Sequence, residues 1–154
     1  MSETIEKRLS GLGITLPVAA APAANYLPYV RTGNLLFPSG QLPMKDGKLA
    51  YTGILGRDVD TATGKEAAKY CAINILAQAK AALGDLEKIR RLVRITIYVA
   101  SAPDFTEQHL VGNGASDFLA EVLGERGKHA RVAVGMASLP LNAAVEIDSI
   151  FEVE

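Results

Sequence analysis

Apolar positions recur along the chain with two different periods, and each period predicts one kind of element. Helical spacing predicts a short N-terminal helix over residues 2–12 and a long helix over 63–83. The same spacing predicts a second long helix over 105–123, with Asp104 as its N-cap. Alternation of β-branched and polar residues predicts a strand over 92–100.

Shorter alternating runs predict hairpins at both ends of this central region. Residues 26–31 and 34–41 predict two strands joined by a tight turn. Residues 129–137 and 144–153 predict two further strands, which a turn over 138–142 would join as a second hairpin.

The remaining segment, residues 44–63, is rich in glycine and polar residues and predicts a loop, with a short strand near 49–52. The elements together predict an α+β fold in which one mixed sheet of five to six strands carries two long helices on one face. The length of 154 residues fits a single domain. Because the last strands are apolar at most positions, we expect the second face of the sheet to be buried against another subunit.

Charge and composition narrow the class of protein. Sixteen Lys and Arg residues against 17 Asp and Glu residues give a net charge of −1, which argues against electrostatic binding of nucleic acid. The single cysteine, Cys71, lies in a helical pattern and is expected to be buried, which fits a reducing cytoplasm. No apolar run reaches the length of a membrane span, so we expect neither export nor membrane insertion.

Several familiar catalytic patterns are incomplete in this sequence. A phosphate-binding loop at Gly64 would need glycine where Val59 stands. The two histidines, His109 and His129, lack the spacing of metal ligands, so no metal site is expected. Ser39 lacks the flanking glycines of a nucleophile elbow.

One arginine remains as a candidate for binding chemistry. Alternation along the strand places Arg131 on one face together with Ala133, Gly135 and Ala137. Such small side chains leave a hollow beside the guanidinium, and a guanidinium binds a carboxylate through two parallel hydrogen bonds. The same pattern is also compatible with a structural ion pair.

An acidic residue on the next strand is the second candidate. Glu146 and Asp148 share one face, and an acid beside the hollow can hold or activate water. A symmetric hairpin would set Arg131 opposite Ser149, which leaves Glu146 roughly 10 Å away along the partner strand. Bringing the two together would need a bulge, the reach of the side chains, or two subunits. Alone, Glu146 is more typical of a solvent-facing acid or of an ion-pair partner of Arg131.

Short fragments in a fixed order carry a resemblance to a known family. They are Ala21-Pro-Ala-Ala, Leu27-Pro-Tyr29-Val, Pro38-Ser-Gly40-Gln-Leu-Pro43, Asn113, Ala130-Arg131, Ser138-Leu-Pro140 and Val145-Glu146-Ile-Asp148-Ser-Ile. In this order they resemble the YjgF/RidA family of imine deaminases, formerly named endoribonuclease L-PSP. The resemblance implies a chorismate-mutase-like domain over residues 21–154, preceded by a helical extension over 1–20, and a homotrimer with ligand sites between subunits.

The resemblance also implies roles for individual residues. Arg131 matches the arginine that binds the substrate carboxylate, and Glu146 matches the acid that positions the hydrolytic water. The implied substrate-binding residues are Tyr29, Ser39, Gly40, Asn113 and Ala133, the last standing where the family often has cysteine. No cofactor is implied.

The leading hypothesis is therefore cofactor-independent hydrolysis of 2-imino or enamine acids to 2-oxo acids and ammonia. An alternative is a trimeric binding module that senses a small carboxylate without turning it over. Ribonuclease activity is the third hypothesis, and the near-neutral charge and the lack of a basic aromatic surface argue against it. The extension and the longer loop over 44–63 place the chain nearer a longer subgroup of the family.

Overall fold

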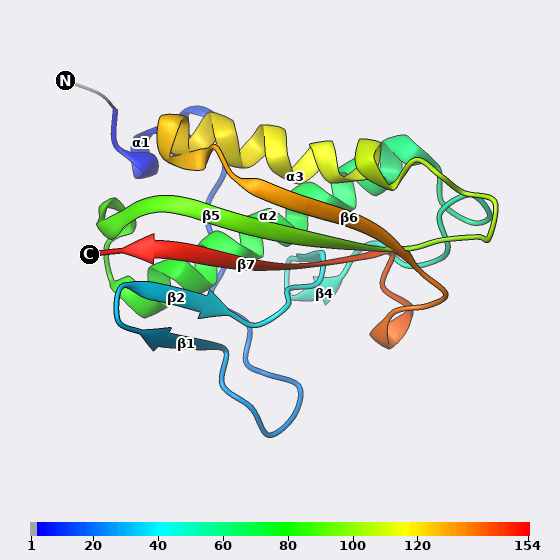
Figure 1. Cartoon of the computed structure of the whole chain (residues 1–154), viewed down its shortest axis with the longest axis horizontal. Coiled ribbons are helices and arrows are strands. Elements are labelled where there is room, and N and C mark those ends of the chain that lie inside the picture. Colours follow the sequence, from blue (N-terminus) through cyan, green and yellow to red (C-terminus); the bar gives the residue numbers. More distant parts are fainter. Residues whose placement is uncertain (1–2) are drawn as a thin grey trace.

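Five strands form one mixed sheet in the order β1-β2-β7-β5-β6 (Figure 1). Their bounds are Tyr29–Thr32 for β1, Leu35–Pro38 for β2, Ile89–Ala100 for β5, Ala130–Met136 for β6 and Val145–Val153 for β7. The computed structural model describes residues 3–154. Strand β6 runs parallel to β5, and the other neighbouring pairs are antiparallel. The prediction of a mixed sheet is confirmed.

Two long helices cover one face of this sheet, as the sequence predicts. Helix α2 (Thr61–Leu83) begins at Asp60, whose side chain accepts a hydrogen bond of 2.8 Å from the Thr63 amide. Helix α3 (Gln108–Leu123) crosses close to α2 at Gly114, where a β-carbon would overlap the Lys65 carbonyl oxygen. The hydrophobic core lies between these helices and the sheet.

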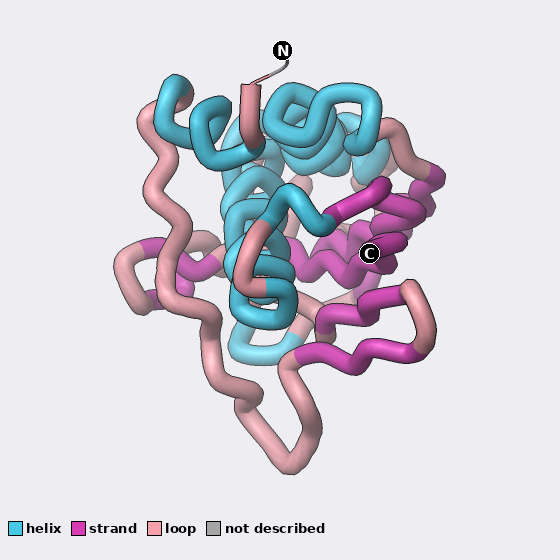
Figure 2. Tube along the Cα trace, turned by 90° about the vertical axis from the view of Figure 1, so that its left-hand side faces the viewer, coloured by secondary structure: helices cyan, strands magenta, loops and turns pink. Residues whose placement is uncertain are grey.

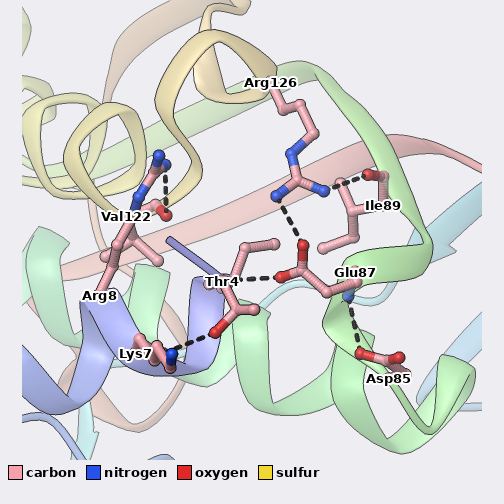
Figure 3. Close-up of polar contacts among 9 residues, drawn as sticks. Thr4, Lys7, Arg8, Asp85, Glu87, Ile89, Val122 and Arg126 are labelled. Atoms are coloured by element: carbon pink, nitrogen blue, oxygen red, sulfur yellow. Dashed lines mark hydrogen bonds and ion pairs between the residues drawn. The ribbon is translucent and has the colours of Figure 1, made fainter. Parts of the chain in front are cut away.

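The N-terminal helix α1 (Ile5–Gly11) packs against the same core, and Figure 3 shows the polar contacts around its N-terminal end. Ile5 and Leu9 are fully buried. The Glu87 carboxylate accepts a hydrogen bond of 2.7 Å from the Ile5 amide and one of 3.2 Å from Arg126. The predicted helix over 2–12 is therefore present from Ile5, while residue 2 lies outside the described residues.

A long loop connects α1 to β1 and runs beside α2 (Figure 2). Two buried amides on α2 hold the segments that cross it. Gln78 donates 2.8 Å to the Ala20 carbonyl in this loop, and Asn74 donates 3.0 Å to the Met44 carbonyl. Side chains of α2 therefore hold both the loop before β1 and the segment after β2. The pattern of hydrophobic and polar residues alone does not reveal these contacts.

Two local predictions are wrong. Helix α3 begins at Gln108 and not at residue 105, and Asp104 is not its N-cap, because the chain first makes a turn to which the Gln108 side chain donates 2.8 Å at the Phe105 carbonyl. No strand covers 49–52. Instead β3 (Met44–Lys45) and β4 (Lys48–Leu49) pair across Asp46 and Gly47, which both have positive φ, as a tight hairpin turn requires.

The predicted C-terminal hairpin is also wrong, because β5 lies between β6 and β7. Ile95 pairs with Arg131 on one side and with Ser149 on the other. The connection from β5 through α3 returns the chain parallel to β5, so β6 becomes the edge strand. None of the helices within residues 3–154 combines the length and the hydrophobicity that a membrane span requires.

Candidate active site

Arg131 lies on the helix-facing side of the edge strand β6 and is held by α3. Its Nη2 donates 2.9 Å to the His109 carbonyl, and its Nη1 donates 3.1 Å to Ser116 Oγ. Gly112 lies directly beside it, since a β-carbon there would stand 3.2 Å from Nη1. These bonds use two of the five N–H groups of a guanidinium, so three donors are left for a ligand.

A histidine fixes the hydroxyl that Arg131 contacts. His129 Nδ1 lies 2.6 Å from the Gly127 carbonyl, and its Nε2 lies 2.9 Å from Ser116 Oγ. Because a carbonyl oxygen can only accept, Nδ1 carries a proton; when this is the only ring proton, Nε2 accepts from the Ser116 hydroxyl. The lone pairs of Ser116 Oγ are then free to accept from Arg131. The hydrogen bonds from Gly127 through His129 and Ser116 thus orient the Arg131 guanidinium.

Glu146 lies on the opposite, helix-free face of the sheet. Its neighbours Val145 and Ile147 on β7 are fully buried toward the helices, which turns Glu146 the other way. The carboxylate is half-buried against Gly40, where a β-carbon would overlap Oε2 and lie 3.2 Å from Cδ. Burial and, second, the charge of Asp148 raise the pKa of Glu146. An acid of this kind is suited to exchange protons with water.

Three of the five predicted substrate-binding residues lie at one or the other of these two places. Ala133 shares the helix-facing side of β6 with Arg131. Ser39 and Gly40 lie at the Glu146 end, and Ser39 Oγ donates 2.7 Å to the Leu27 carbonyl. Asn113 lies half-buried on α3.

Tyr29 on β1 is half-buried and packs against the core. It forms neither half of the site within one chain. Arg131 and Glu146 therefore lie in two separate half-sites of a single chain, on opposite faces of the sheet.

Sequence reasoning missed the residues that hold Arg131. Gly112 and Ser116 are four positions apart, so they share one side of α3. His129 and Arg131 are two positions apart and share one face of the chain entering β6. Both spacings can be read from the sequence, but nothing in the sequence indicates that α3 packs against β6. Within residues 3–154, no three His, Cys, Asp or Glu side chains are grouped as metal ligands.

Comparison with known proteins adds the family context. The model of the YjgF/chorismate mutase-like endoribonuclease family matches residues 6–152. The crystal structure of Atu1372 from Agrobacterium tumefaciens, a protein of unknown function, shares 63% identity and a TM-score of 0.92, covering 97% of this chain and 92% of that one.

Two relatives with assigned names are also similar. Protein TCP17 of Trypanosoma cruzi is 49% identical over 98% of this chain and 95% of its own length. A 2-iminobutanoate/2-iminopropanoate deaminase of Dermatophagoides farinae is 28% identical over 92% of this chain and 95% of its own length.

Proposed function

Because the chain belongs to the YjgF/RidA family, we propose that it is a cofactor-independent deaminase of 2-imino or enamine acids. The products are a 2-oxo acid and ammonia. A distant relative bears the name of such a deaminase, which supports the substrate class. We further propose a cytoplasmic enzyme, an assignment that the buried free thiol of Cys71 supports.

The reaction needs only water and acid–base help. The water oxygen bonds to the imine carbon while the imine nitrogen takes up a proton. The resulting carbinolamine then loses ammonia, its hydroxyl proton leaves, and the carbonyl of the 2-oxo acid forms. Positioning of the water and the substrate supplies the acceleration without a covalent intermediate.

The observation that carries the proposal is the restraint of Arg131. Two N–H groups fasten the guanidinium to α3 through His109 and Ser116, and three remain for the substrate carboxylate. A guanidinium held in advance loses little side-chain entropy when the carboxylate binds. The half-buried Glu146 would supply the second function, holding the attacking water and accepting its proton.

The two residues would act together across a subunit interface. Within one chain they occupy opposite faces of the sheet, so we propose a homotrimer in which Arg131 of one copy meets Glu146 of the next. The exposed side chains of Val30, Phe37 and Val132 support a covered sheet face.

The first experiment measures turnover directly. An amino-acid oxidase or a dehydratase generates the imine in situ, and release of the 2-oxo acid is followed with wild type, Arg131→Ala and Glu146→Gln. Both variants should lose the acceleration over the spontaneous rate. If Arg131→Ala turns over as fast as wild type, the proposed function is wrong. If wild type binds 2-oxo acids but does not accelerate hydrolysis, the protein is a carboxylate-binding module.

Mixing the two inactive variants tests the shared site. After the two variants are unfolded and refolded together, an intact site needs its arginine from a Glu146→Gln copy and its glutamate from a neighbouring Arg131→Ala copy. Random assembly gives this arrangement in about one quarter of the neighbour pairs. Activity should therefore return to about a quarter of the wild-type value. No recovery in the mixed trimer would contradict a site built from two chains.

A further inference from the structure

A hydrogen bond between β5 and β7 lies beside Glu146, on the helix-free face of the sheet. Tyr98 of β5 stands directly opposite Glu146 in the register of the two strands. Its neighbours Ile97 and Val99 are fully buried toward the helices, which turns Tyr98 to the same face as Glu146. The Tyr98 hydroxyl reaches diagonally to β7 and donates 3.1 Å to Asp148 Oδ2. Tyr98 therefore faces the candidate base and holds the acid two positions further along the strand.

The carboxylates of Glu146 and Asp148 share one face of β7, where like charges repel each other. Within residues 3–154, neither of them lies in an ion pair that would offset this repulsion. Both side chains are half-buried, and a rotation about χ1 of Asp148 would carry its charge away from Glu146. The hydrogen bond from Tyr98 opposes that rotation, and a bond to an ionised acceptor is stronger than one between neutral groups.

The other groups that lie beside Glu146 carry no charge at neutral pH. Gly40, in the segment after β2, has no side chain. Cys71 lies across the sheet on α2, where burial and, second, the charge of Glu146 raise the pKa of its thiol well above the usual value. Burial and the bond to Asp148 raise the pKa of Tyr98, so the phenol keeps the proton that it donates. Burial is the first cause that raises the pKa of Glu146, and the charge of Asp148 is the second.

We propose that Tyr98 is a positioning residue whose hydroxyl holds the Asp148 carboxylate beside Glu146 and thereby tunes Glu146 as a base. A base is most effective when it exchanges its proton near the working pH, and a neighbouring negative charge brings a carboxylate closer to that range. The catalytic consequence rests on the proposed function, whereas the hold on Asp148 can be measured without turnover.

Tyr98→Phe is the decisive variant, because it removes the donor and keeps the ring that helps to bury Glu146. Asp148 should then turn away, and the pKa of Glu146 should fall, because its charged form is repelled less. The full chain, labelled with ¹³C at the glutamate side-chain carboxyl groups, is titrated with pH and followed by NMR. The Glu146 signal is the one that is missing from Glu146→Gln.

Three more variants complete the titration. Asp148→Asn should move the Glu146 titration to lower pH by more than Tyr98→Phe does, because it removes the charge instead of displacing it. The double variant Tyr98→Phe/Asp148→Asn should titrate like Asp148→Asn alone, since the hydroxyl acts through Asp148. Tyr51→Phe is the matched control: it also loses a hydroxyl, from a ring that packs against Tyr70 of α2 with 5.8 Å between the ring centroids, and it should leave the titration unchanged.

The pH dependence of kcat gives a second measurement. Because the proposed base must be ionised, the acidic limb of the kcat profile should move to lower pH in Tyr98→Phe. Below that limb, the variant should keep a larger fraction of its own plateau kcat than the wild type keeps. Loosened packing would lower kcat at every pH and give no such relative gain, and the Tm of Tyr98→Phe checks the fold.

Three results would overturn the proposal. The first is a Glu146 titration in Tyr98→Phe that coincides with the wild type or moves to higher pH. The second is a further shift when Tyr98→Phe is added to Asp148→Asn, because the hydroxyl would then act without Asp148. The third is an equal shift in Tyr51→Phe. If the wild type shows no imine turnover but the Glu146 titration shifts as expected, the proposed function is wrong and the hold of Tyr98 on Asp148 stands.

Discussion

Gly40 makes room for the Glu146 carboxylate, and replacing it with alanine should move that carboxylate without unfolding the protein. The new β-carbon would overlap Glu146 Oε2 and lie 3.2 Å from Cδ. Gly40 does not have a positive φ, so alanine fits the backbone there. The obstacle is the end of a flexible side chain, which can swing away at little cost.

The size of the effect follows from this overlap. Non-bonded carbon atoms settle at about 3.5–4.0 Å, so the carboxylate must retreat by on the order of 1 Å. A displacement of that size in a catalytic group costs on the order of 100-fold in rate. The change from glycine to alanine by itself stabilises a permitted backbone by about 0.4–1 kcal/mol. We therefore expect kcat to fall about 100-fold, while Tm stays within a few degrees of the wild type.

The assay compares Gly40→Ala with Gly11→Ala, whose added β-carbon meets no atom within 4 Å. Imine turnover gives kcat and KM, and calorimetry gives Tm. KM should stay unchanged, because the Arg131 half-site is not touched. The double variant Gly40→Ala/Glu146→Gln should be no less active than Glu146→Gln alone, since both changes act on one group. If the kcat of Gly40→Ala equals that of Gly11→Ala, the assignment of Glu146 is refuted.

Three further outcomes follow from the same structure. Leu9→Ala removes a fully buried side chain of α1 and should lower the free energy of unfolding by about 2–5 kcal/mol and Tm by about 5–15 °C. Leu12→Ala, at a 41% exposed position, should change the free energy of unfolding by less than about 0.5 kcal/mol. Equal Tm values for the two variants would show that α1 does not pack against the core. Ser116→Ala should raise KM about fivefold at unchanged kcat, and Ser116→Thr should restore it; a fall in kcat alone would contradict the positioning role. Burial and the charge of Asp148 raise the pKa of Glu146, so the base loses its negative charge, and kcat falls, as the pH drops through that raised value. Asp148→Asn should move this acidic limb of the kcat profile to lower pH, though not to the ordinary glutamate value, because burial is the larger cause; an unmoved limb would assign it to another group.

The elements that the sequence predicted well are those whose period depends on one uniform environment. Helix α2 is alanine-rich along its length, and β5 alternates between a buried and an open face, so each could be recognised locally. The start of α3 could not, because a turn stabilised by the Gln108 side chain competes with the first helical turn there.

Strand order was harder to predict than strand position. Only residues 137–144 separate β6 from β7, and local reasoning favours a hairpin for such neighbours. The two strands instead occupy opposite sides of β5. The residue pattern is consistent with this order, since β7 is buried at every second position while β6 has no fully buried residue, as suits an edge strand.

This strand order decides between the ways in which Arg131 and Glu146 can form one site. A bulge shifts a strand along its neighbour, but β6 and β7 are not neighbours. Side-chain reach fails as well, because the guanidinium is fastened to α3 on one face while Glu146 lies against Gly40 on the other. The sheet itself separates them, and no change of rotamer crosses it. A site that uses both residues must therefore be completed by a second copy of the chain, and β6, at the edge of the sheet, is the strand that can bring Arg131 to it.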